Sequence, residues 1–146
     1  MTSAPDHTAL QTLHQLRTGQ LQGCTRLDLR GCGLSAMPPE VLALEDTLEV
    51  LDLSGNALST LPDGLSRLSR LHTLFASANR FTSLPEVLGR LPALDTLGLK
   101  ANQLTEVPPG ALAPSLRWLI LTDNRITALP HTLTEKKSVS GFSVES

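Results

Sequence analysis

The chain has 146 residues, of which 40% are hydrophobic and 18% are charged, and its net charge at pH 7 is -2. This composition is typical of one folded domain and argues against a disordered chain. No apolar run approaches the roughly 20 residues that cross a bilayer, and residues 1–20 lack the pattern of a secretory signal. We therefore expect a cytoplasmic protein with no membrane partner. The mixed charges form no basic stripe, which argues against nucleic acid as a partner.

Residues 1–23 are predicted to form a helical cap. Asp6 is a suitable N-cap residue, and Gly19 can end the helix in the left-handed conformation. Between them we expect one apolar stripe, formed by Leu10, Leu13 and Leu16. Such a helix would shield the first copy of the repeat that follows it.

From residue 24 onward the sequence contains five copies of one repeat. Four copies share the same landmarks, and they read LEVLDLSGNALSTLP, LHTLFASANRFTSLP, LDTLGLKANQLTEVP and LRWLILTDNRITALP. An eroded first copy, CTRLDLRGCGLSAMP, begins at Cys24, and successive starts are 24, 23, 23 and 22 residues apart. This period predicts a solenoid of five units over residues 24–133, with the units at 24–47, 48–70, 71–93, 94–115 and 116–133.

The pattern inside each unit predicts an α/β solenoid, with a curved parallel sheet on one face and short helical or turn segments on the other. Apolar residues alternate as in a strand with one buried face, at Leu51/Leu53, Leu74/Ala76, Leu97/Leu99 and Leu119/Leu121. Asparagines then recur where the chain leaves the strand, and they predict a buried hydrogen-bonded ladder of Asn56, Asn79, Asn102 and Asn124. A recurring proline suits the start of the convex turn, at Pro62, Pro85, Pro108 and Pro130. Because no unit can bury both faces alone, stability must come from stacking.

After Leu133 the repeat pattern stops. Residues 134–146 are polar and serine-rich, and we expect them to be disordered. The last unit would then expose apolar surface, which favours a partner or self-association through this uncapped end. Three alternatives stay open here: a natural truncation, a frameshift, or an unusual cap formed by Val139, Phe142 and Val144.

These landmarks resemble the leucine-rich-repeat family over residues 24–133. More narrowly, TLHQLRTGQLQGCTRLDLRGCGL, DTLEVLDLSGNALSTLP, VLGRLPALDTLGLKANQL and SLRWLILTDNRITALP resemble the N-terminal repeats of bacterial leucine-rich-repeat proteins that carry a protein kinase domain further along. The chain holds no kinase glycine-rich loop, H-R-D or D-F-G motif, so the resemblance implies a recognition surface and no kinase activity.

Residues between the buried leucines should face the concave side of the sheet in three columns. The first column is Arg26, Val50, Thr73, Thr96 and Trp118; the central column is Asp28, Asp52, Phe75, Gly98 and Ile120; the third is Arg30, Ser54, Ser77, Lys100 and Thr122.

The C-terminal half of this face is the predicted partner-binding site. Phe75, Trp118 and Ile120 flank Gly98, which we expect to leave a dip, and such a composition is typical of an interaction hot spot. The predicted binding residues are Phe75, Trp118, Ile120, Gly98, Val50, Thr73, Thr96 and Lys100. The alternative is that the two aromatic side chains only cover their neighbours.

The other polar residues receive structural interpretations. The charged N-terminal half of the face, Arg26, Asp28, Arg30 and Asp52, is interpreted as side chains that pair across adjacent strands.

The cysteines are interpreted as structural. Cys24 takes the place of a buried leucine and Cys32 that of a ladder asparagine. Eight residues of extended chain separate the two thiols by more than a disulfide spans. The histidines, His7, His14, His72 and His131, have no ligand spacing, and no histidine is placed to activate a serine. We therefore predict no catalytic residue, no metal and no cofactor.

The leading hypothesis is a non-enzymatic module that binds a protein partner through its concave face. Two other hypotheses stay open. The chain could be a truncated N-terminal regulatory or ligand-binding fragment of a bacterial leucine-rich-repeat kinase, or a bacterial leucine-rich-repeat effector that acts on a host protein.

Overall fold

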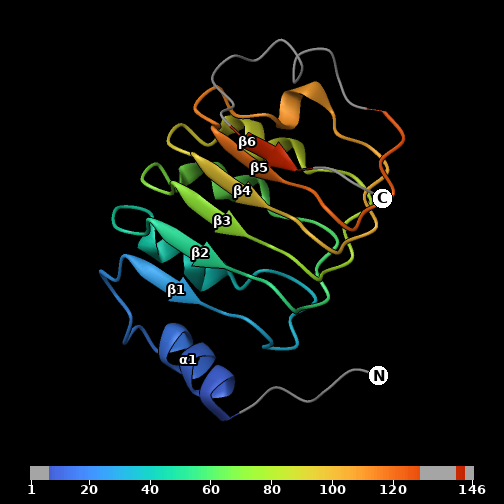
Figure 1. Ribbon diagram of the computed structural model, residues 1–146. Coiled ribbons are helices and arrows are strands. Elements are labelled where there is room, and N and C mark those ends of the chain that lie inside the picture. Colours follow the sequence, from blue (N-terminus) through green and yellow to red (C-terminus); the bar gives the residue numbers. More distant parts are fainter. Residues whose placement is uncertain (1–6, 129–140, 144–146) are drawn as a thin grey trace.

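The computed structural model describes residues 7–128 and 141–143, and in these ranges one helix precedes a stack of short strands (Figure 1). The helix is α1 (His7–Arg17), and the strands are β1 (Arg26–Asp28), β2 (Val50–Asp52), β3 (Thr73–Phe75), β4 (Thr96–Gly98), β5 (Trp118–Ile120) and β6 (Gly141–Ser143). Four 3-10 turns connect successive strands: η1 (Pro39–Leu44), η2 (Asp63–Arg67), η3 (Glu86–Arg90) and η4 (Pro109–Ala111). The six strands form one sheet in sequence order, and every neighbouring pair is parallel.

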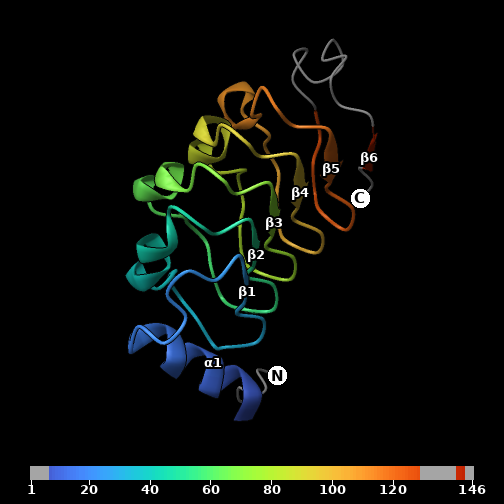
Figure 2. The same cartoon turned by 90° about the vertical axis from the view of Figure 1, so that its left-hand side faces the viewer.

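The strands line the inner curve of the molecule, and the 3-10 turns lie on the opposite, outer side (Figure 2). A proline occupies the N-cap position of each turn, namely Pro38, Pro62, Pro85 and Pro108. Proline holds φ near the value that such a turn needs at its start. The convex segments are 3-10 turns of three to six residues, and this geometry occurs in proteins as short connecting pieces.

The core is a row of leucines that stack from unit to unit. Inward-facing strand residues are fully buried, including Leu51, Leu74, Leu97 and Leu119. From the convex side, Leu65 and Leu68 of one unit and Leu88 and Leu91 of the next are also fully buried. Each unit therefore completes its core against its neighbours, as the predicted solenoid requires.

Helix α1 covers the first unit, but the predicted apolar stripe is wrong at one position. Leu13 and Leu16 are buried, at 6% and 4% exposure, whereas Leu10 is 48% exposed. Ala9, at 9% exposure, completes the buried face instead. It lies four residues before Leu13 and seven before Leu16, which places all three on one side of a helix. The predicted helix end is confirmed at Gly19, with φ of 79°, and the predicted N-cap, Asp6, lies outside the described residues.

Part of the C-terminal segment corrects the expectation of disorder. Residues 141–143 form β6, which pairs with β5 in the register Trp118↔Gly141, Leu119↔Phe142 and Ile120↔Ser143. Gly141 follows Trp118 by 23 residues, which matches the repeat period. A main-chain ladder needs no particular side chain, so this strand forms without the leucine and asparagine landmarks. Val139 and Val144, the other residues of the cap considered above, lie outside the described residues.

Deletion of residues 134–146 is expected to destabilise the protein, because β5 would lose the ladder partner that β6 provides. Each lost hydrogen bond is worth roughly 0.5–1.5 kcal/mol, so the free energy of unfolding should fall by about 1–3 kcal/mol. Thermal unfolding followed by circular dichroism measures the change, with deletion of residues 144–146 alone as the control. Equal melting temperatures for the full chain and the longer deletion would show that β6 does not protect this end.

Candidate functional site on the concave face

The register of the sheet aligns the concave columns. Pairing of β1 through β5 joins Arg26, Val50, Thr73, Thr96 and Trp118 in one row, and joins Asp28, Asp52, Phe75, Gly98 and Ile120 in the next. Adjacent strands lie about 4.8 Å apart, so neighbours within a row are in contact range. The structure thus brings together on one face the predicted site residues of the first two columns.

The asparagine ladder fixes the chain where it leaves each strand. Asn79 is 5% exposed; its Oδ1 accepts the Leu58 N–H at 2.9 Å, and its Nδ2 donates to the Leu53 and Ala76 carbonyls at 2.9 and 3.1 Å. The other ladder residues, Asn56, Asn102 and Asn124, bond to two successive units in the same way. In the first unit Cys32 takes the ladder position, and its thiol donates to the Ala9 carbonyl at 3.5 Å. These bonds hold the concave columns on a fixed framework.

The expected dip at Gly98, in the C-terminal half of the concave face, is wrong because the Phe75 side chain fills it. A Cβ added to Gly98 would lie 2.8 Å from Cδ1 of Phe75 and 3.2 Å from Cε1, so the Phe75 ring occupies the space above the glycine. Gly98 is buried beneath it. Trp118 and Ile120 lie on β5, two strands beyond Phe75, and are 51% and 36% exposed. We call Phe75, Trp118 and Ile120 the apolar platform.

The N-terminal half of the face contains a hollow of about 330 Å³. It is lined by Arg26, Leu27, Asp28, Arg30, Val50, Asp52 and Phe75, and we call it the N-terminal hollow. Phe75 belongs both to this hollow and to the apolar platform, so the two features are continuous on the sheet. The hollow could not be predicted from the sequence, because it depends on how the charged side chains pair.

The predicted cross-strand pairing is present in one contact, between Arg30 and Asp52, but the shorter bonds of Arg30 are to Asp28 of its own unit. Arg30 makes two hydrogen bonds to Asp28, with Nε to Oδ1 at 3.0 Å and Nη2 to Oδ2 at 2.8 Å. Across the strands, Arg30 Nε lies 3.7 Å from Asp52 Oδ2. The bond from Arg30 holds the pKa of the Asp28 carboxyl below its usual value, which keeps the pair charged. Both side chains are more than half exposed, so their contribution to stability is small.

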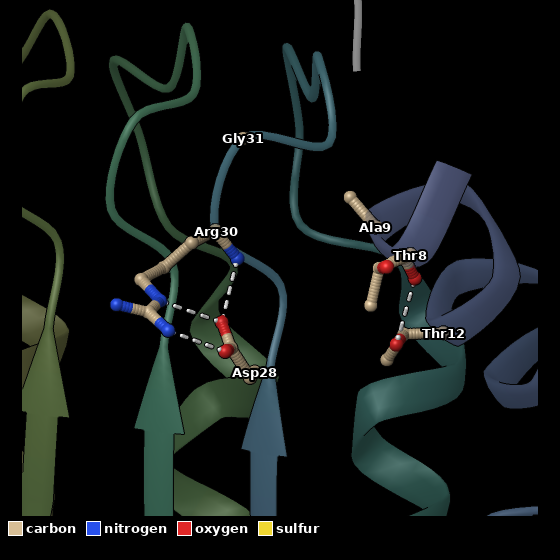
Figure 3. Close-up of a pocket in the computed structure, with 6 residues that line it drawn as sticks. All are labelled: Thr8, Ala9, Thr12, Asp28, Arg30 and Gly31. Atoms are coloured by element: carbon tan, nitrogen blue, oxygen red, sulfur yellow. Dashed lines mark hydrogen bonds and ion pairs between the residues drawn. The ribbon is translucent and has the colours of Figure 1, made fainter. Parts of the chain in front are cut away.

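A second hollow of about 400 Å³ lies between α1 and the end of β1, lined by Thr8, Ala9, Thr12, Asp28, Arg30 and Gly31 (Figure 3). The Thr12 hydroxyl donates to the Thr8 carbonyl at 3.1 Å. Arg30 occupies both oxygens of Asp28. The Thr12 hydroxyl is thus bonded to the main chain of α1, and Asp28 and Arg30 are bonded to each other.

Residues 7–128 and 141–143 contain no group of three histidine, cysteine or acidic side chains that could hold a metal ion. Among the same residues, no helix is long and apolar enough to span a membrane. Cys24 and Cys32 are both thiols, and burial raises the pKa of the Cys24 thiol, which disfavours the reactive thiolate.

The leucine-rich repeat family matches residues 18–132. The chain therefore belongs to the leucine-rich repeat family. No curated protein sequence matches it.

Three solved structures place the chain among repeat proteins of known shape. A leucine-rich-repeat protein of Leptospira interrogans is 31% identical with a TM-score of 0.70, and the match covers 90% of this chain and 33% of that protein. Internalin C2 from Listeria monocytogenes is 25% identical with a TM-score of 0.74, and the match covers 89% of this chain and 55% of that one. TLR13, in its complex with ssRNA13, is 30% identical over 83% of this chain and 18% of its own, with a TM-score of 0.74. The chain thus spans about a third to a half of the two bacterial proteins.

Because TLR13 holds an RNA, the fold alone does not support the exclusion of nucleic acid.

Proposed function

We propose that this chain is a non-enzymatic binding module that recognises another protein through the concave face of its sheet. The observation that carries the proposal is the apolar platform. Trp118 is 51% exposed and Ile120 is 36% exposed on β5, and the Phe75 ring of β3 covers Gly98 on the strand between. Large apolar side chains gathered on a solvent-exposed surface are typical of an interface, and aromatic side chains often contribute most of its binding energy.

The framework beneath the platform supports the same function. The asparagine ladder and the buried leucines fix the strands before a partner arrives, so little conformational entropy is lost on binding. The Leptospira and Listeria relatives favour a bacterial source, and the cytoplasm remains the location that we propose.

The recognition region of a larger protein is a second candidate, and the same concave face would serve it. It is favoured by the resemblance to the repeats of bacterial kinases and by the larger size of the solved relatives.

Affinity capture from a lysate of the producing organism tests the proposal. The bait is the full chain, compared with a Phe75→Ala/Trp118→Ala double variant that circular dichroism shows to be folded. The matched control is Arg80→Ala/Gln103→Ala, because both residues are exposed and lie outside the concave columns. Truncation of a hot-spot residue weakens binding by about 2 kcal/mol or more, so the platform variant should recover at least about 30-fold less of the captured protein.

Equal recovery by the platform variant and the control would contradict binding at the concave face. Treatment of the lysate with ribonuclease separates the two kinds of partner. Loss of the captured material after that treatment would contradict a direct protein partner.

A further inference from the structure

The hydrogen-bond acceptors of the N-terminal hollow are already engaged, whereas one of its cations is not. Both oxygens of Asp28 are bound by Arg30. Asp52 accepts the Ser54 N–H through Oδ1 at 2.9 Å, and its Oδ2 lies 3.7 Å from Arg30. Arg26 lines the same hollow and is exposed, and within the described residues no carboxylate lies within 4.0 Å of it. The hollow therefore offers a guanidinium whose donors are available, and this group binds carboxylates in a bidentate manner.

The net charge of the concave face also favours an acidic partner, although the net charge of the whole chain is -2. The three concave columns hold three cations, Arg26, Arg30 and Lys100, against two carboxylates, Asp28 and Asp52. Lys100 is also exposed, and in the described part of the chain it has no ion pair. A partner with an acidic group would thus complement this face electrostatically.

The hollow continues along the first column toward the apolar platform. Val50 and Phe75 form part of its wall, and the register then leads through Thr73 and Thr96 to Trp118. Arg26 and Trp118 are four strands apart, or about 19 Å at roughly 4.8 Å per strand. An extended peptide rises about 3.3 Å per residue, so about six residues span this distance.

Resting on the proposed function, we infer that the partner contributes an extended, acidic and apolar segment. One aspartate or glutamate binds Arg26 in the N-terminal hollow, and a bulky apolar side chain about six residues away packs on the apolar platform. The segment crosses the strands along the first column. Its acid supplies the carboxylate partner that Arg26 lacks among the described residues, and its apolar residue covers the exposed Trp118.

Single-stranded RNA fits this face less well. RNA binding relies on a series of basic side chains that follow the phosphates. In the described residues, Arg26 and Lys100 are the only concave-column cations without a carboxylate partner, and they lie in different columns on β1 and just beyond β4. Two separated cations favour one or two carboxylates over a continuous polyanion.

Selection from a random displayed library of twelve-residue peptides tests this inference with the full chain as bait. We compare four baits: the unchanged chain, Arg26→Gln, Phe75→Ala/Trp118→Ala, and the control Arg80→Gln, which alters an exposed arginine outside the concave columns. The unchanged chain and the control should enrich peptides with an acid about six positions from a leucine, isoleucine, phenylalanine or tryptophan. Arg26→Gln should lose the preference for the acid and keep the preference for the apolar residue.

A selected peptide that contains no tryptophan, together with its Glu→Gln or Asp→Asn counterpart, then gives affinities from the fluorescence of Trp118, the one tryptophan of the chain. Arg26→Gln should weaken the acidic peptide about tenfold and leave the amide peptide unchanged. Platform-dependent enrichment with no acid preference would overturn this inference and leave the proposed function standing. Absence of any platform-dependent enrichment would contradict both, and saturable binding of poly(U) without peptide enrichment would replace the peptide by RNA.

Discussion

Replacement of Asn124 by alanine should lower the free energy of unfolding by about 3–5 kcal/mol. Asn124 is 5% exposed, and its Oδ1 accepts the backbone N–H groups of Asn102 and Leu104 at 3.1 and 3.0 Å. Alanine would leave both of these buried donors without a partner, and each such loss destabilises a protein by about 1–3 kcal/mol. The bonds from Nδ2 to the Leu99 and Leu121 carbonyls would be lost as well.

Gln103→Ala is the matched control for this measurement. Gln103 lies between the two residues whose N–H groups Asn124 accepts, but its own side chain is exposed, so its loss should change stability by less than about 0.5 kcal/mol. Urea unfolding followed by circular dichroism gives both values. If the two variants unfolded at the same urea concentration, the ladder would not be a principal source of stability.

Gly89→Ala should destabilise the convex side by about 3 kcal/mol. Gly89 lies in η3, and a Cβ at this position would collide with the carbonyl oxygen of Gly110 in η4 and lie 2.8 Å from its carbonyl carbon. The obstacle is backbone, which cannot move without disturbing the stacking of two units. Overpacking of this kind destabilises proteins by about 1–3 kcal/mol and sometimes more.

Gly110→Ala tests the other side of the same contact. A Cβ on Gly110 would meet only the Glu86 side chain, at 3.9 Å, which is an ordinary contact distance. Its melting temperature should therefore stay close to that of the unchanged chain, while that of Gly89→Ala falls by several degrees. Similar melting temperatures for both variants would contradict the close approach of η3 and η4.

The strand register could be predicted from the sequence because its landmarks repeat. A one-residue error would turn leucines such as Leu51 and Leu74 to the solvent, so the alternation admits one alignment. The recurring asparagines mark the same position in each unit, since a buried amide there must bond to the backbone. Together these constraints define the concave columns from the sequence alone.

The remaining features depend on choices that the pattern does not constrain. Ala9 is as compatible with an apolar helix face as Leu10, and packing against the first unit decides between them. The space above Gly98 depends on the rotamer of Phe75, and the hollow beside it depends on how the Arg30 side chain lies between Asp28 and Asp52. Strand β6 pairs through main-chain hydrogen bonds, which any non-proline residue can make, so the side-chain pattern did not predict it.

Fluorine NMR on the chain labelled with 5-fluorotryptophan tests concave-face recognition most directly, because Trp118 is the one tryptophan and is half exposed in the unbound protein. The captured partner, unlabelled, is added to saturation. We predict that the single resonance shifts and loses its sensitivity to exchange of H₂O for D₂O, as expected when the platform is covered. A partner that saturates the chain while this resonance and its solvent sensitivity stay unchanged would contradict binding at the concave face.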